Sequence, residues 1–216
     1  MAHVEHDTAT VRRLRFGVGV LGMVLPFAVT VGNMVQTGET VLLSSISGSY
    51  YTGMRDVFVG SLAAIGAFLI GYRYAPVDDA LSTIAGLAAI AVALFPTAQR
   101  GQEVLVTAAG GTTGMIHGIA AAVLFLVLAI FCFFLFPRSA TPGAMTTAKK
   151  SRNVIYYLCG FLIVAGLGLA ALAGKILPGE VTSWLKPMFW GQSVALFAFG
   201  VAWFTKSNII FRSRES

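Results

Sequence analysis

The sequence predicts an all-α integral membrane protein, a bundle of six transmembrane helices with both termini in the cytoplasm. Hydrophobic residues make up 56% of its 216 residues and charged residues only 11%, whereas soluble domains carry about 25% charged residues. The mean hydropathy is +0.80, and several apolar segments reach the roughly 20 residues that a helix needs to cross a bilayer. Lys and Arg gather in alternate connecting segments, as expected for a multi-pass protein of a bacterial inner membrane.

The predicted spans follow the apolar segments in chain order. Residues 1–13 are polar, unlike a cleaved signal peptide, and are expected to form a cytoplasmic tail. The membrane domain covers residues 14–206, and residues 207–216 form a second cytoplasmic tail. Within the domain, the expected spans are about 14–35, 56–74, 80–98, 114–136, 153–174 and 187–205.

The second span determines how a polar segment, Ser44–Asp56, meets the membrane. This segment is rich in Ser, Tyr, Thr and Gly, and ends in Arg55 and Asp56. The apolar stretch Val57–Tyr72 is shorter than the roughly 20 residues of a crossing. The span therefore has to draw Gly53–Asp56 into the edge of the membrane, where lone charges are costly and normally paired.

Turn residues and small residues mark the later spans. Asp78 or Asp79 is expected to cap the third span, because carboxylates are favourable at a helix N-terminus. Pro96 breaks the same span near its far end. Gly166 and Gly168 in the fifth span are expected to permit close helix packing.

The orientation follows from counting Lys and Arg on the two sides of the predicted membrane domain. Positive residues favour the cytoplasm. The predicted cytoplasmic side holds Arg12, Arg13, Arg15, Arg73, Arg138, Lys149, Lys150, Arg152, Lys206, Arg212 and Arg214, and the opposite side holds only Arg55, Arg100, Lys175 and Lys186.

Polar side chains recur in the outer third of most spans, while the inner halves are almost wholly apolar. The outer groups are Asn33, Arg55, Asp56, Ser61, Thr97, His117 and Gln192, with Tyr50 and Tyr51 near their level. Intramembrane polar groups need partners, and ionisable ones usually face the bundle interior or a water-filled cavity. One outward-facing pocket that binds a small molecule, an ion or a lipid headgroup would accommodate them all. A closed hydrogen-bond network with a purely structural role is the alternative.

Catalysis is a further alternative. A lipid hydrolase could use Ser45 or Ser47 with Asp56 and His117, although the chain has no G-x-S-x-G motif. Too few histidines and carboxylates lie in the membrane for a metal site, and no cofactor is expected. Basic residues flank apolar segments instead of forming a stripe with aromatics, which argues against a nucleic-acid partner. Membrane lipids are the expected partners, and the sequence favours a non-enzymatic binder, sensor or transporter component.

The chain contains the motif Ser-x-Ser-x-x-Tyr-Tyr-Thr-x-x-Arg-Asp-x-Phe-Val-Gly at Ser45–Gly60 and the motif Ala-Gly-x-x-Ala-x-x-Val-Ala-Leu-Phe-Pro-Thr at Ala85–Thr97. With these motifs it resembles a group of uncharacterised bacterial six-helix membrane proteins. Arg152-Asn153-x-x-Tyr156-x-x-Cys159-Gly160 fits the same group. The resemblance implies the fold and no specific function. A looser similarity, through Ser45 or Ser47, Asp56 and His117, is to the alkaline ceramidase/adiponectin-receptor superfamily, whose members hold zinc in seven helices. This chain lacks their additional histidines and seventh helix.

Overall fold

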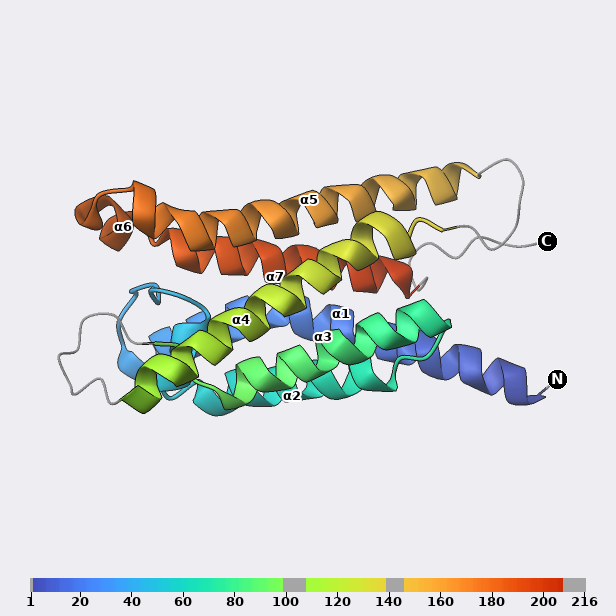
Figure 1. The fold of residues 1–216 in the computed structure, drawn as a ribbon, viewed down its shortest axis with the longest axis horizontal. Coiled ribbons are helices and arrows are strands. Elements are labelled where there is room, and N and C mark those ends of the chain that lie inside the picture. The colour runs from blue at the N-terminus through green and yellow to red at the C-terminus, as the bar shows by residue number, and fades with distance from the viewer. Residues whose placement is uncertain (1, 99–107, 139–145, 208–216) are drawn as a thin grey trace.

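The computed structural model describes residues 2–98, 108–138 and 146–207, and all secondary structure in these ranges is helical. Long helices lie side by side along one common direction (Figure 1). The elements are α1 Ala2–Thr37, the 3₁₀ helix η1 Ser47–Tyr51, α2 Arg55–Gly71, α3 Pro76–Leu94, α4 Ala108–Ile130, the π-helical turn η2 Phe131–Leu135, α5 Thr147–Ile176, α6 Gly179–Leu185 and α7 Pro187–Lys206.

Five of these helices are long and apolar enough to cross a membrane: α1, α3, α4, α5 and α7. This confirms the prediction of an all-α, multi-pass membrane protein. Helix α2 has 17 residues and packs between α1 and α3. The sixth crossing and the cytoplasmic location of the termini stay predictions.

Two helical segments differ from the expected pattern. Helix α1 begins at Ala2, so it runs through most of the segment that was expected as a polar tail. The connection expected between the fifth and sixth spans contains the short helix α6, with Trp184 81% exposed on it. Pro187 then occupies the first turn of α7, a position where its missing N–H costs nothing.

The bundle has two distinct ends in Figure 1. We call the end that carries η1 and α6 the loop end. The start of α1, the turn between α2 and α3, the start of α5 and the end of α7 lie at the other end, which we call the base. Helix α4 runs obliquely: it lies close to α3 at the loop end and approaches α5 toward the base.

Pairs of glycines allow the closest helix contacts. A Cβ atom at Gly66 in α2 would lie 2.8 Å from the carbonyl oxygen of Gly86 in α3. A Cβ atom at Gly166 in α5 would lie 2.5 Å from the carbonyl oxygen of Gly191 in α7. Real side chains cannot fit at such distances, so these backbones approach closely because both residues lack one. Gly168, expected to play the same part, meets no described atom within 4 Å.

An aromatic cluster fills the core toward the base. The ring centroid of Trp203 lies 5.1 Å from that of Tyr72, 5.5 Å from that of Phe131 and 5.3 Å from that of Phe136. All four side chains are fully buried. Tilted and edge-on rings of this kind add stability beyond their buried area, and this cluster joins α7 to α4 and to the turn after α2.

Candidate functional site

The polar segment after α1 folds back into the loop end of the bundle. Residues 45–51, which we call the plug segment, include Ile46 with 1% of its surface exposed, and Ser47 and Ser49 are buried beside it. Ile46 belongs to the hydrophobic core, so it anchors the segment by removing apolar area from water. The serine-rich motif is therefore part of the interior and not a surface loop.

Most hydroxyl groups in this region satisfy the backbone of the loop itself. The Ser45 hydroxyl accepts a hydrogen bond from the Gly48 N–H at 3.0 Å. Thr52 donates to the carbonyl of Ser49 at 2.9 Å and accepts from the N–H of Met54 at 3.1 Å, just before α2 begins. Such local bonds are typical of Ser and Thr in turns. They stabilise the fold of the segment and leave Ser47 as the serine directed at another helix.

Ser47 is held by Gln192, one turn inside α7. The Ser47 N–H donates to Oε1 of Gln192 at 3.1 Å, and Nε2 of Gln192 donates to the Ser47 hydroxyl at 3.3 Å. One side-chain amide thus satisfies both the backbone and the side chain of a buried serine. This pair fixes the plug segment against α7.

His117 closes the end of α3. Helix α3 ends at Leu94, and Phe95 is extended because a residue before proline avoids the helical region. Nδ1 of His117 lies 2.7 Å from the freed carbonyl oxygen of Phe95. The Tyr51 hydroxyl donates to the next free carbonyl, that of Thr97, at 2.6 Å. Both side chains therefore satisfy carbonyl groups that the broken helix leaves without partners.

A small cavity of about 40 Å³ lies where the plug segment meets the apolar core. Ser47, His117 and Gln192 contribute its polar groups, and residues such as Leu62 and Phe125 its apolar walls. A volume of this size exceeds the roughly 10–15 Å³ that a water molecule requires. The arrangement can accommodate water beside three hydrogen-bonding side chains, and it is too small for a larger ligand.

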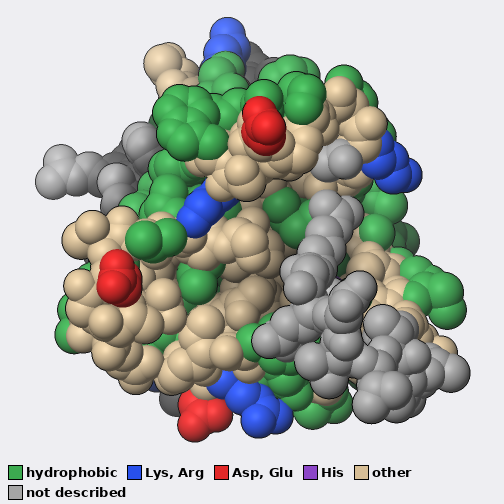
Figure 2. Space-filling view, turned by 90° about the vertical axis from the view of Figure 1, so that its left-hand side faces the viewer, with side chains coloured by type: hydrophobic (Ala, Val, Ile, Leu, Met, Phe, Trp, Pro, Cys, Tyr) green, Lys and Arg blue, Asp and Glu red, His purple; other side chains and the backbone are tan. Residues whose placement is uncertain are grey.

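A much larger cavity of about 700 Å³ lies at the loop end, and the plug segment forms part of its lining. Figure 2 looks onto this end, where backbone and uncharged, non-hydrophobic side chains surround a hollow and hydrophobic side chains gather along the rim on the side of α6. Its size falls within the range of about 300–1,000 Å³ that is typical of ligand sites. The cavity is lined by Ser44, Ser45, Gly48, Tyr51, Thr97, Ala98, Gly114, Ala170, Gly179, Thr182, Ser183, Lys186, Pro187 and Met188.

Lys186 gives this larger cavity its charge. It is the only charged side chain among the described lining residues. Its backbone is left-handed, with φ of 47°, a conformation that is uncommon for residues other than glycine and that makes the sharp turn from α6 into α7. Its ammonium group donates to the carbonyl of Leu42. A cation held by a neutral acceptor, beside several hydroxyl groups, favours an anionic ligand electrostatically.

The residues predicted for one pocket lie in several places. Tyr51 and Ser45 line the large cavity, and His117, Gln192 and Ser47 line the small one. Asn33 and Asp56 line neither, and Asp56 is exposed.

Arg55 finds its partner in its own loop and not on another helix. It donates to the Tyr50 hydroxyl at 2.9 Å, and its guanidinium carbon lies 4.6 Å from the centre of that ring. Neither Arg55 nor Asp56 pairs with His117 or Gln192, whose hydrogen bonds join Phe95 and Ser47 instead.

The lining that comes from α6 and its flanks was not predicted. Thr182, Ser183 and Lys186 lie between the expected spans 153–174 and 187–205. A usable signal is that Lys186 is one of only four cations on the predicted outer side and follows Thr182 and Ser183 by four and three positions.

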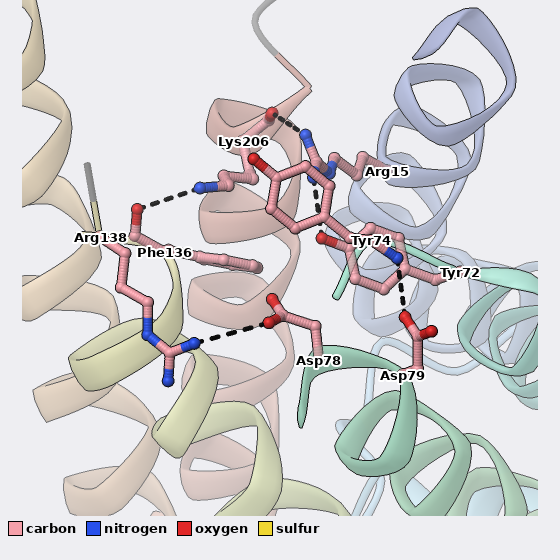
Figure 3. A network of polar contacts seen from close by, with 8 residues as sticks. All are labelled: Arg15, Tyr72, Tyr74, Asp78, Asp79, Phe136, Arg138 and Lys206. Carbon is pink, nitrogen blue, oxygen red and sulfur yellow. Dashed lines mark hydrogen bonds and ion pairs between the residues drawn. The ribbon is translucent and has the colours of Figure 1, made fainter. Parts of the chain in front are cut away.

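The base contains a second polar network that the sequence analysis also missed (Figure 3). Arg15, only 8% exposed, donates to the Tyr72 hydroxyl at 2.8 Å. Its guanidinium carbon lies 5.1 Å from the ring centre of Tyr72 and 4.9 Å from that of Tyr74.

The charged groups of this network join four helices. Asp78, 5% exposed, pairs with Arg138 at 3.7 Å, while Asp79 accepts from the N–H of Tyr74 at 2.7 Å. Lys206 donates to the carbonyl of Phe136 at 3.0 Å. The expectation that Asp78 or Asp79 caps α3 is wrong, because the helix begins after Ala75 without a side-chain cap hydrogen bond. Asp78 instead forms an ion pair, which the sequence does not indicate because Arg138 is 60 positions away.

Comparison with models of protein families, with curated proteins and with solved structures finds no match to this chain. The resemblances stated from sequence motifs therefore stay predictions. Among the described residues, no group of three or more His, Cys, Asp or Glu side chains gathers where it could hold a metal ion. Cys132 and Cys159 are free and buried.

Proposed function

We propose that this chain is an inner-membrane protein of six crossings with cytoplasmic termini, and that its large cavity binds an anionic small molecule or lipid headgroup from outside the cell. The observation that carries the proposal is the cavity of about 700 Å³ whose only charged lining residue, within the described chain, is Lys186. Hydroxyl groups of Ser44 and Ser45 line the same cavity and are suitable hydrogen-bond donors to phosphate or carboxylate oxygens.

The six crossings and their orientation have independent support. Helix α2 packs against two spanning helices, so it occupies the place of a crossing although it is short. Among the described residues, nine Lys and Arg residues then lie on the side of the base and three on the side of the loop end, and the positive-inside rule assigns the more positive side to the cytoplasm. The large cavity would consequently face outward.

A binder, sensor or transporter component is better supported than an enzyme. Ser47 and His117 share the small cavity, but Asp56 lines neither cavity and is exposed. His117 is bonded to a backbone carbonyl, which leaves the Ser–His–Asp hydrolase alternative without an acid to orient the histidine. The hydrophobic core below the cavity favours a binding site with one entrance over a continuous ion path.

The test is the binding of glycerol 3-phosphate, with neutral glycerol as the comparison, to purified protein in nanodiscs by isothermal titration calorimetry. We expect Lys186→Gln to weaken binding of glycerol 3-phosphate about 10- to 100-fold, the effect of losing a charged hydrogen bond worth roughly 1.5–3 kcal/mol. Lys175→Gln is the matched control, because Lys175 is exposed and does not line the cavity. Equal binding by wild type and Lys186→Gln, or no binding by either, would contradict the proposal.

A further inference from the structure

Helices α4 and α5 are joined near the base. The ring of Phe133, in the turn that continues α4, stacks on Tyr157 of α5 with centroids 6.5 Å apart and planes inclined by 27°. A Cβ atom at Gly160 of α5 would lie 2.8 Å from the same Phe133 ring. These contacts fix which faces of the two helices are directed at each other.

Toward the loop end the same two faces separate. Met115 and Leu126, which precede Phe133 and lie 11 positions apart, share one face of α4; they are 59% and 51% exposed. Val164, one turn beyond Gly160 on α5, is 47% exposed. A Cβ atom at Gly118, between Met115 and Leu126, would meet no described atom within 4 Å. Figure 1 shows the cause, because α4 crosses obliquely from α5 toward α3.

The gap between these faces leads into the large cavity. Gly114, next to Met115 on α4, and Ala170 on α5 both line that cavity. An apolar wedge, which we define by Met115, Gly118, Leu126 and Val164, therefore connects it sideways to the hydrocarbon region of the membrane. The polar groups stand at the wide end of the wedge, where Lys186 and the hydroxyl groups lie.

We propose that an anionic phospholipid enters the cavity sideways, with its phosphate beside Lys186 and one acyl chain in the wedge between α4 and α5. This inference rests on the proposed function, since it names the class of ligand that the cavity holds. Two features on one continuous surface support it: a cation with hydroxyl groups at the level of lipid headgroups, and apolar walls running from there toward the membrane interior. A water-soluble anion would use the first feature and leave the second unoccupied.

The experiment measures how much phosphatidylglycerol stays bound to the protein. Wild type and variants are reconstituted in nanodiscs of equal parts phosphatidylglycerol and phosphatidylcholine, then released into detergent and examined by native mass spectrometry. We expect the wild type to retain phosphatidylglycerol in preference to phosphatidylcholine. Val164→Trp fills the wedge and should reduce retained phosphatidylglycerol about tenfold, while Val31→Trp on α1, at a site with similar exposure of 56%, should not.

Glycerol 3-phosphate separates failure of this inference from failure of the proposed function. If Val164→Trp weakens phospholipid retention but leaves glycerol 3-phosphate binding unchanged, the inference is supported. If Val164→Trp changes neither while Lys186→Gln weakens glycerol 3-phosphate binding, the lipid inference is overturned and the proposed function stands. Loss of a homodimer in Val164→Trp would show that a second copy covers the wedge, and this also overturns the inference. If Lys186→Gln has no effect on either ligand, both proposals fail.

Discussion

His117 and Gln192 each satisfy backbone groups that the fold would otherwise leave buried without partners. His117 does so for the carbonyl of Phe95, and Gln192 for the N–H of Ser47. A buried polar atom that loses its partner costs about 1–3 kcal/mol. At the scale of single residues, these two side chains therefore hold the plug segment and the end of α3 in the positions that form the floor of the large cavity.

We expect His117→Phe and Gln192→Leu each to lower the free energy of unfolding by about 1–3 kcal/mol, because each leaves a buried backbone group unbonded. Asp56→Asn changes an exposed residue that lines neither cavity, and it should alter that free energy by less than about 0.5 kcal/mol. Chemical unfolding in mixed micelles, followed by circular dichroism, measures all three. A destabilisation by Asp56→Asn equal to that of the other two would show that Asp56 has an essential partner in the folded protein.

At the scale of helices, small residues determine which pairs lie closest. Helix α5 packs along α7 at the facing Gly166 and Gly191, and α2 packs along α3 at the facing Gly66 and Gly86. In lipid there is no hydrophobic driving force between helices, so close van der Waals packing has to stabilise such pairs. Toward the loop end, the described residues of α4 and α5 make no similar close contact, and this leaves room for the wedge.

Substitution of Gly166 and of Gly168 in α5 separates the effect of helix packing from that of helix propensity. Gly166→Leu should lower the free energy of unfolding by about 1–3 kcal/mol or more, because its Cβ atom would overlap the carbonyl oxygen of Gly191. Gly168→Leu lies on the same helix, two residues further on, and meets no described atom within 4 Å, so it should be neutral or slightly stabilising. The same unfolding assay measures both variants. Equal destabilisation by the two would mean that the α5–α7 contact does not depend on the small residue.

At the scale of the whole molecule, the two ends of the bundle differ in kind. The base holds a network of buried charges and aromatic rings that joins α1, α3, α7 and the end of α4. The loop end holds a large cavity with one cation among its described lining residues. At the base, Asp78 pairs with Arg138, and Arg15 and Lys206 donate to a tyrosine hydroxyl and to backbone carbonyls. These contacts favour a fixed structure there, and we propose ligand binding at the loop end.

The proposed topology predicts which residues face the outside of intact cells. Cysteines introduced at Thr40 and Trp184 should react with a membrane-impermeant maleimide before permeabilisation, and cysteines at Val77 and Ser151 only afterwards. All four positions are exposed, and native Cys132 and Cys159 are buried, so background reaction should be low. Reaction of Thr40→Cys and Val77→Cys from the same side would show that α2 does not cross the membrane.

The sequence by itself determined that the chain is a helical, multi-pass membrane protein, because long apolar segments have no other stable arrangement in a bilayer. It also located the polar groups at one end, including Tyr51, His117 and Gln192. Only the tertiary structure decided which contacts these groups make. His117 and Gln192 are bonded to backbone atoms, and Lys186 lines the large cavity. Hydrogen-bond partners such as Ser47 and Gln192 are 145 positions apart, so their contact depends on how the helices pack and leaves no periodic pattern in the chain.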